Sequence, residues 1–336
     1  MNYQPKGFFA RLLIDKCRND TILENCDMSE VPALIIRCCS IIGKLQQLYS
    51  NSTSMNPLFG KWYTLLNIPK EFRNRFINMG SPDEITLQWI EQSRLESSKL
   101  WLQLWHLLAK AFLSVFMTQT DVNGILRRGS MYILSDNQFQ TILTNSGLKN
   151  LANNGNNTIR VLDIGAGDGE VTARLVNAIS LLVPDSNITL FATESSWVMR
   201  SRLAEKQIQV VEEINVLNNV DFVSCLNVLD RCIDPLALLH EIYSVLAPDG
   251  RLMVALVLPY SHYVEKNSSH LPLRPLLDHW PNHTGMSIEK EIEAFFKKLE
   301  IVGFTILSWT KAPYLCEGDL RQSFYWLDDI VVVCSK

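Results

Sequence analysis

The pattern of apolar and polar positions predicts alternating strands and helices in the second half of the chain. Short apolar runs that end at polar or glycine residues predict seven strands: Ile159–Ile164, Ile188–Thr193, Ile208–Val211, Val220–Leu226, Arg251–Leu258, Phe304–Trp309 and Tyr325–Cys334. Apolar residues at three- and four-residue spacing predict the helices Val171–Leu182, Val198–Lys206, Leu236–Leu246 and Ile288–Leu299. No helix separates the last two strands, which are joined by Thr310–Ser323. A doubly wound α/β sheet with its seventh strand inserted antiparallel fits this order.

The first half of the chain has a different pattern. Residues 58–150 predict a helical extension packed on the core, with helices that start near Pro69 and Pro82 and a further one capped by Ser135 or Asp136. The apolar stretch Trp101–Met117 contains polar residues and is too short for a membrane span, so it predicts an amphipathic helix packed on the core. Residues 1–57 are left unassigned, and residues 151–336 form the sheet domain.

The first predicted strand runs into a glycine turn, GAGDG at 165–169. Gly165 and Gly167 remove side chains where the backbone bends and where a ligand lies against it, and the next helix begins with free N–H groups. Asp163 precedes the turn. The G-x-G-x-G spacing departs from the G-x-G-x-x-G of dinucleotide-binding folds, and an acid at this position suits an amino-acid ammonium group. The turn therefore favours S-adenosyl-L-methionine over NAD, and the architecture is that of a class I, seven-stranded, Rossmann-like methyltransferase with a helical N-terminal extension.

Further polar candidates follow other strands of the predicted sheet, where ligands of such sheets bind. Glu194 ends the second strand and can accept hydrogen bonds from ribose hydroxyls, although an acid at a helix N-terminus has the same pattern. Its position 25 residues after Gly169 favours the cofactor role. Asn215 follows the third strand and can meet the adenine edge, although an ordinary turn asparagine is the commoner explanation.

The segment after the fourth strand contains the candidates for the methyl-transfer site. Asn227 and Asp230 are three residues apart, so a helical turn would place both on one face. Two structural alternatives stay open for Asp230, namely a salt bridge with Arg231 or a role in the cap at Asp234.

Composition and charge exclude some classes of protein. The net charge of −4 and the absence of a lysine and arginine cluster argue against a nucleic-acid substrate. Eight cysteines lack paired C-x-x-C spacing, so no metal site is predicted. The apolar run near the start is interrupted by Arg11, which argues against a signal peptide. A cytoplasmic location without stable membrane insertion is expected, with the endoplasmic reticulum or mitochondrion as alternatives; the oligomeric state is left open.

Seven stretches together make the chain resemble the DREV family of methyltransferase-like proteins, protein-histidine N-methyltransferases that modify the pros nitrogen in His-x-His motifs. The resemblance runs from about Leu58 to the C-terminus, and its most specific parts are CLNVLDRC and PYLCEGD. Arg127 stands where the family usually has glycine, and no secretory leader of the kind common in animal members is expected here. The matching stretches are residues 123–131, 162–172, 192–194, 224–232, 255–260, 313–319 and 327–329.

The resemblance implies roles for individual residues. Glu194, Asn227 and Tyr314 would contact S-adenosyl-L-methionine, while Asp230 and Tyr325 would face the substrate imidazole. The partners would be proteins or peptides with His-x-His motifs. Two alternatives remain at this stage, a methyltransferase for another acceptor such as a small molecule and a non-catalytic scaffold with the same fold. Intact cofactor and acceptor residues argue against the scaffold.

Overall fold

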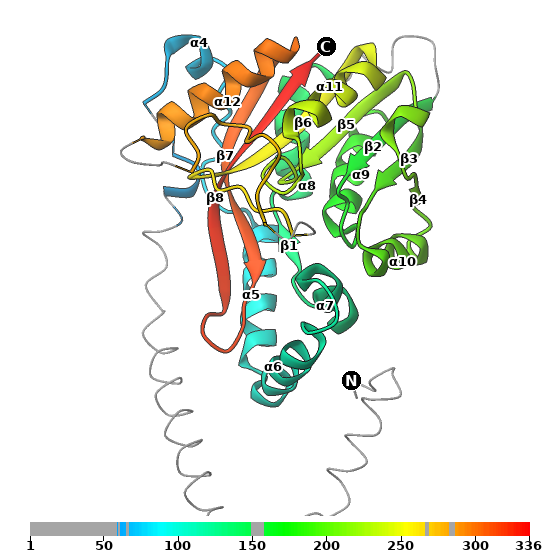
Figure 1. The fold of residues 1–336 in the computed structure, drawn as a ribbon. Coiled ribbons are helices and arrows are strands. Elements are labelled where there is room, and N and C mark those ends of the chain that lie inside the picture. Colours follow the sequence, from blue (N-terminus) through cyan, green and yellow to red (C-terminus); the bar gives the residue numbers. More distant parts are fainter. Residues whose placement is uncertain (1–58, 60, 65–66, 149–157, 266–268, 282–285) are drawn as a thin grey trace, which may run out of the picture. The chain divides into compact units, whose positions relative to one another are not determined.

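The structure is a computed structural model that describes residues 59, 61–64, 67–148, 158–265, 269–281 and 286–336 (Figure 1). They belong to one compact unit, Asn56–Lys336. Residues 1–57, unassigned from the sequence, lie outside the described residues.

An eight-stranded sheet forms the centre of this unit, in the order β1-β7-β8-β6-β5-β2-β3-β4. β8 is antiparallel to both β6 and β7, and the pairs among β2 to β6 are parallel. The prediction of an inserted antiparallel last strand is therefore confirmed. The strands are β1 Met131–Tyr132, β2 Thr158–Ile164, β3 Asn187–Thr193, β4 Gln209–Val210, β5 Val220–Leu226, β6 Leu246–Leu258, β7 Thr305–Glu317 and β8 Phe324–Ser335.

All seven predicted strands are present, but three details of the prediction are wrong. β6 begins at Leu246 instead of Arg251. β1 is an additional edge strand, too short to be recognised by alternation. β7 continues through the predicted connection to Glu317, so the turn to β8 is shorter than expected. Lys311 lies in the predicted connection but is buried on β7, where its Nζ lies 2.9 Å from Asp328 Oδ1 and donates to the Lys61 carbonyl.

Helices cover both faces of the sheet (Figure 1). On one side, Leu239 of α11 and Phe295 of α12 join a buried cluster with alternate sheet residues such as Leu162. Residues between these, such as Val161, are buried on the other side with Leu175 of α9. Fully apolar central strands are what a parallel sheet covered on both faces requires. The helices here are α8 Asp136–Asn145, α9 Glu170–Leu182, α10 Trp197–Glu205, the 3₁₀ turn η3 Ile214–Val216, α11 Pro235–Val245 and α12 Ile288–Val302.

The helices before β2 form the predicted extension. Asp83 caps α5 by accepting the Thr86 N–H at 2.9 Å, and Ser135 caps α8 in a capping box with Gln138. The β7–β8 hairpin extends beside α5 (Figure 1), and Ser93 of α5 donates to the Ser323 carbonyl at its tip. Besides α8, the extension comprises α4 Lys70–Arg73, α5 Glu84–Ser98, α6 Leu100–Leu113 and α7 Gln119–Leu126.

One expectation about the extension fails at α6. The helix is present, but its largest apolar side chains, such as Trp101 and Phe112, are exposed instead of packed on the core. No helix in the described parts of the chain combines the length and apolar character needed to cross a membrane.

The edge of β7 that faces away from β8 is paired with other parts of the chain along two segments. β1 pairs with Leu315 and Cys316, and the chain before α5 forms a bridge in which Phe76 faces Trp309. The Ile77 N–H donates to the Trp309 carbonyl at 2.8 Å, and the Trp309 N–H donates to the Arg75 carbonyl at 3.0 Å.

Arg127 ends α7 in a left-handed backbone conformation, with φ of 53°. Glycine adopts this conformation without strain, so we expect Arg127→Gly to raise the free energy of unfolding by about 1 kcal/mol. Urea denaturation measures the change. Arg127→Ala is the control, because it also removes the exposed 3.5 Å ion pair with Glu205 but keeps a strained Cβ. Equal stability of the glycine and alanine variants would contradict the backbone explanation.

Candidate active site

The glycine turn connects β2 to α9 in the left-handed backbone region. Gly165 has φ of +69°, and a Cβ built on it would lie 2.6 Å from Val228 Cγ2. Gly167 has φ of +56°, yet no heavy atom lies within 4 Å of its Cβ position. The first glycine is thus required by protein packing, whereas the second borders open space that a ligand can occupy.

Asp163, two residues before the turn, forms hydrogen bonds with both neighbouring elements. One carboxylate oxygen accepts from Thr172 Oγ1 of α9, and the other accepts from Ser224 Oγ of β5 at 2.6 Å. Burial raises the pKa of Asp163 to about 6, and the charge of Glu194 adds to the shift. Asp163 therefore ties β2, β5 and α9 together beneath the turn, and its predicted contact with the amino-acid end of the cofactor stays a prediction.

Glu194 follows β3 and lies directly against the glycine turn. Its Oε2 accepts the Gly167 N–H at 2.9 Å, and its Oε1 accepts the Ser196 N–H at 2.7 Å. The structure thus brings together the second glycine and the acid that the sequence assigned to the ribose. Asn215, by contrast, is an exposed residue of η3, and its assignment to the adenine edge stays a prediction.

Asn227 begins the segment after β5 with a left-handed φ of 57°. Its backbone N–H donates to the Ala255 carbonyl at 3.1 Å, and its Nδ2 donates to Asp329 Oδ2 at 2.8 Å. The expected helical turn does not start at Asn227, because the first turn contact joins the Arg231 N–H to the Val228 carbonyl. The Asn227 side chain is instead directed by its hydrogen bond to β8.

Asp230 lies in this turn and is only 3% exposed. Its Oδ2 accepts from Arg231 Nε at 3.1 Å, while its Oδ1 is buried without a partner. Burial raises its pKa, and the neighbouring Arg231 guanidinium opposes the shift. The salt bridge considered from the sequence is therefore present but uses one oxygen. The helix cap belongs to Asp234, whose Oδ1 accepts the Ala237 N–H of α11 at 3.0 Å.

Asp329 is a second buried carboxylate that sequence reasoning did not assign to the site. It lies on β8, is fully buried and accepts from Asn227, and its Oδ1 has no partner. Burial raises the pKa of Asp329 to about 7, and the negative charge of Asp230 contributes to the shift. The one signal for it was the Leu327–Asp329 stretch of the family resemblance.

The register of the last two strands places both predicted tyrosines on the face of Asp329. Tyr314 of β7 pairs with Leu327, and Tyr325 of β8 pairs with Cys316. Directly paired residues and those two apart along a strand share one face of a sheet. Tyr325 donates to Asp319 Oδ1 at 2.9 Å, and Tyr314 donates to the sulfur of Met131. Burial, together with the charges of Asp329 and Asp230 among others, raises the pKa of Tyr314 well above its ordinary value, so its hydroxyl stays protonated.

Unpaired acceptors gather in this cluster. Among the described residues, four buried side-chain nitrogen or oxygen atoms lack a hydrogen-bond partner, and three of them are Oδ1 of Asn227, Asp230 and Asp329. Buried polar atoms in proteins normally have partners, and unpaired ones cost free energy. Three acceptors in one cluster favour a ligand that brings N–H or O–H donors.

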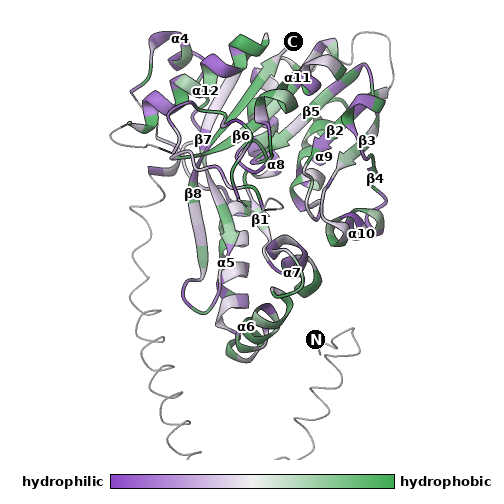
Figure 2. Cartoon of the chain, viewed as in Figure 1, coloured by the Kyte–Doolittle hydropathy of each residue, from purple (hydrophilic) through white to green (hydrophobic). Residues whose placement is uncertain are grey.

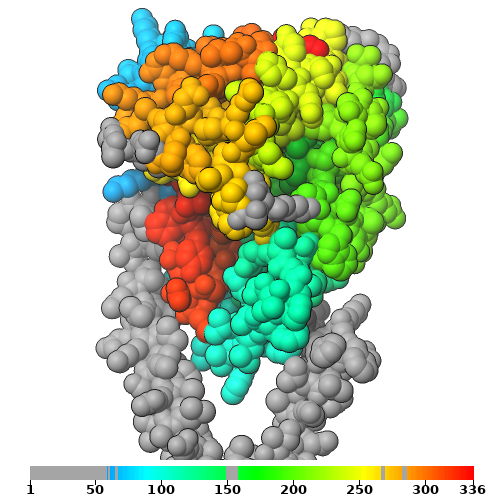
Figure 3. All heavy atoms as spheres, in the orientation of Figure 1, coloured from blue at the N-terminus to red at the C-terminus, as the bar shows by residue number. Residues whose placement is uncertain are grey.

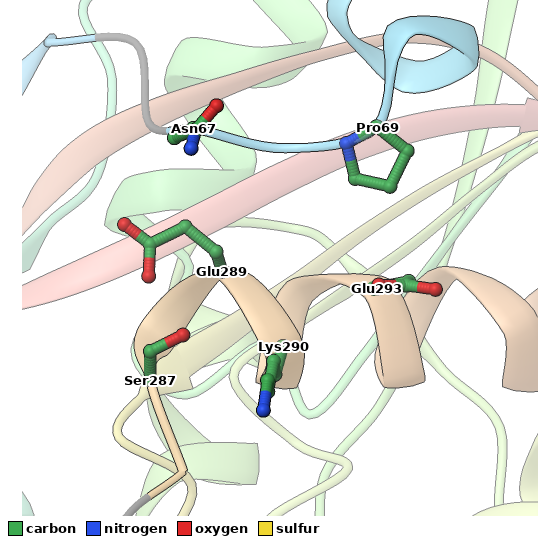
Figure 4. Close-up of a pocket in the computed structure, with 6 residues that line it drawn as sticks. All are labelled: Asn67, Pro69, Ser287, Glu289, Lys290 and Glu293. Atoms are coloured by element: carbon green, nitrogen blue, oxygen red, sulfur yellow. The ribbon is translucent and has the colours of Figure 1, made fainter.

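A separate polar hollow lies between the start of α12 and the chain before α4, where Figure 4 shows Glu289 of the helix opposite Asn67. It shares no residue with the glycine turn or with the carboxylate cluster. We assign it no chemistry. Its lining consists of Asn67, Pro69, Ser287, Glu289, Lys290 and Glu293.

A ligand cradle at the carboxyl ends of β2 and β3, in a sheet whose last strand is inserted antiparallel, is the arrangement of class I methyltransferases that use S-adenosyl-L-methionine. The model of the DREV methyltransferase family matches residues 62–336, and the chain belongs to this family. Its activity is methyl transfer, and S-adenosyl-L-methionine is its cofactor.

Other similarities are more distant. A highly reducing polyketide synthase of Strobilurus tenacellus is 31% identical over 109 residues, which are 29% of this chain and 4% of the synthase. This chain therefore spans a small fraction of that relative. The 1,6-didemethyltoxoflavin N1-methyltransferase of Burkholderia thailandensis is 16% identical, with TM-score 0.34 and coverage of 57% of this chain and 76% of that one. The N-methyltransferase NodS of Bradyrhizobium japonicum is 13% identical, with TM-score 0.33 and coverage of 59% of this chain and 87% of that one.

The two glycines allow a paired test of the cradle. Gly167→Ala adds a methyl group in open space, so we expect a folded protein that binds S-adenosylhomocysteine at least about tenfold more weakly. Gly165→Ala strikes Val228 and should lose more stability than Gly167→Ala. Thermal unfolding and calorimetric titration measure the two effects. Unchanged affinity in Gly167→Ala would exclude this surface as the cofactor cradle.

Buried carboxylates also predict a dependence of stability on pH. The pKa of Asp329 is higher in the folded chain than in the unfolded one, so its protonation stabilises the folded state. This contribution to the free energy of unfolding is complete below about pH 4 and is lost as the pH rises towards 7. Asp329→Asn cannot ionise. We expect the free energy of unfolding of the wild type, relative to this variant, to fall by about 2–4 kcal/mol from pH 4 to 8.

Urea denaturation at several pH values measures this difference. The same substitution at the exposed Asp249 controls for the loss of one charge. A constant difference between the wild type and Asp329→Asn over this range would show that Asp329 does not ionise with a raised pKa.

Proposed function

We propose that this methyltransferase transfers the methyl group to the pros nitrogen of histidine in His-x-His segments of proteins. The observation that carries the proposal is the set of three buried, unpaired oxygens on Asn227, Asp230 and Asp329. They call for an acceptor substrate with hydrogen-bond donors, and the family resemblance from the sequence suggests histidine. Substrate segments flanked by small residues in extended, flexible chain would enter such a site with the least steric hindrance.

Asp230 is suited to select the nitrogen that attacks. A neutral imidazole has one nitrogen with a proton and one with a free lone pair. When a carboxylate accepts the tele N–H, the pros nitrogen keeps its lone pair. Asp230 Oδ1 is free for this contact because Arg231 holds only Oδ2. The same negative charge stabilises the imidazolium that forms as the methyl group arrives.

The residues present fit the cofactor. The open space over Gly167 leaves room for a ligand, and the Glu194 carboxylate beside it can accept ribose hydroxyls. Asn227 and Tyr314 would contact the cofactor near the reacting end, as the resemblance implies. The bound cofactor supplies an electrophilic methyl group on a sulfonium sulfur. The protein has to hold the imidazole lone pair in line with the bond that breaks, because orientation supplies much of the acceleration.

The transferred atoms and charges balance without a further reactant. The nitrogen–carbon bond forms as the carbon–sulfur bond breaks, and the positive charge moves to the imidazole ring. The tele N–H proton then leaves to a carboxylate or to water. Burial raises the pKa of Asp230 and raises that of Asp329 to about 7, so both carboxylates hold a proton more readily than exposed ones do.

Two other functions remain alternatives. A small molecule with an N–H group would satisfy the same unpaired oxygens, so peptide and small-molecule acceptors have to be compared directly. A scaffold that does not catalyse transfer has no use for three unpaired buried acceptors, which lower its stability. The loss of stability from these unpaired oxygens therefore favours an enzyme over a non-catalytic scaffold.

The proposal is tested by incubation of the protein with labelled S-adenosyl-L-methionine and a peptide that contains Ala-His-Ala-His-Ala. We expect label on the pros nitrogen, located by mass spectrometry, and none in a peptide in which alanine replaces both histidines. A Gly165→Arg variant serves as the blank, since its side chain blocks the turn. Cofactor binding by calorimetry without methylation of the peptide would move the assignment to another acceptor.

Asp230→Asn tests the role of the carboxylate. We expect kcat to fall by about 100-fold or more, because the amide carries no charge to stabilise the imidazolium. Affinity for S-adenosylhomocysteine should stay within about twofold, since Asp230 is not assigned to the cofactor. Asp249→Asn is the control. Full turnover of Asp230→Asn with normal folding would rule out orientation and charge stabilisation by this residue.

A further inference from the structure

Helix α6 is apolar on most of its sides, and many of its large apolar side chains are exposed. The buried residues are Gln103, 2% exposed, and Ala109, 9% exposed. Trp101, Leu108 and Phe112 are 86%, 68% and 67% exposed. A surface helix of a globular protein normally turns its apolar stripe to the core, whereas these three large side chains of α6 face away from it.

Polar contacts hold the inner side of α6 in place. Gln103 donates to the Glu96 carbonyl at 2.9 Å and accepts from Arg128 Nη1 at 2.7 Å. Arg128 also pairs with Glu317 of β7 at 3.1 Å and lies 3.3 Å from His106 Nδ1. Burial, together with the charge of Arg128, lowers the pKa of His106 to about 4, so the ring is neutral at physiological pH. Rotation of α6 to bury its apolar side would break this network.

The exposed side chains form one continuous surface, which we call the α6 patch. Positions 101, 104, 108 and 112 follow helical spacing, and the chain after the helix extends the stripe. The rings of Phe112 and Phe116 lie 5.5 Å apart. In Figure 2 the helix is mostly green, and Figure 3 shows this part of the chain on the outside of the molecule. The patch consists of Trp101, Leu104, Leu108, Phe112, Val115 and Phe116.

Charge around the patch points to the chemistry of its partner. No aspartate or glutamate occurs from residue 99 to residue 120. Lys110 is exposed in this segment, whereas Lys99 pairs with Glu96 at 2.6 Å. The whole chain carries a net charge of −4, so this region has the opposite sign. Tryptophan, phenylalanine and leucine on one side, with lysine and without acids, are typical of helices that lie in the interface of an anionic membrane.

We propose that the α6 patch docks on the surface of a membrane that contains anionic lipids. The helix has 14 residues and would lie in the headgroup region with its apolar stripe in the acyl boundary. Lys110 at this level adds attraction to acidic headgroups. This inference uses no residue of the methyl-transfer site and is independent of the proposed acceptor.

The full chain is tested by flotation with vesicles of phosphatidylcholine alone and with about one-third phosphatidylserine. We expect binding to the anionic vesicles, weakened at least about tenfold in a triple variant, Trp101→Gln, Leu108→Gln and Phe112→Gln. The control variant carries Leu181→Gln, Leu273→Gln and Ile301→Gln, since these residues are also exposed apolar side chains and lie outside the patch. Lys110→Glu should weaken binding to anionic vesicles as well.

Three results would overturn the proposal. The first is no binding to either type of vesicle, and the second is equal loss of binding in the patch variant and the control. The third is self-association that the patch variant abolishes, measured by light scattering after size exclusion, in a protein that does not bind vesicles. Circular dichroism and cofactor affinity verify that the variants are folded.

Discussion

The hydrogen bond between Asn227 and Asp329 joins residues 102 positions apart in the chain, and the arrangement of the site depends on it. Asn227 follows a parallel strand, β5, while Asp329 comes from the antiparallel strand β8 on the far side of β6. Only the insertion of β8 between β6 and β7 brings these residues together. The same strand places Tyr325 and, through its pairing with β7, Tyr314 on the face of the sheet that carries Asp329. The same insertion of β8 therefore determines both the strand order of the sheet and the polar groups of the site.

The buried carboxylates at the site lower the free energy of unfolding, because burial disfavours their charged forms. Asp163, Asp230 and Asp329 are all buried, and each has a raised pKa because burial disfavours the charged form. The three carboxylates nevertheless differ in their partners. Asp163 has both oxygens occupied and holds the backbone of the glycine turn, whereas the other two each keep one oxygen unpaired. A protein that only needed a stable core would place apolar side chains here.

Local signals predicted most of the fold. Apolar runs gave the strands, helical spacing gave the helices, and Ser135 was recognised as a cap. The glycine turn and Glu194, which the structure places in contact, were both identified from their positions at strand ends. Such features depend on residues close in sequence or on the regular order of a parallel sheet.

Features set by long-range packing could not be predicted. The unpaired oxygen of Asp329 depends on its contact with Asn227 and on burial, neither of which the sequence displays locally. Lys311 looked like a loop residue because its buried ion pair with Asp328 is invisible in a hydrophobicity pattern. The spacing of α6 predicted a helix correctly but not which side faces inwards, since Arg128 and Gln103 decide that.

The short strand β1 has a consequence for the behaviour of the protein at high concentration. The edge of a sheet presents free N–H and C=O groups to any other strand, which makes it a template for aggregation. On β7 these groups are used by β1 near Cys316 and by the bridge at Trp309, and the opposite edge strand, β4, has only two residues. Neither edge offers a long, free strand to a second molecule, so the chain can keep a large sheet without recruiting copies of itself into a fibril.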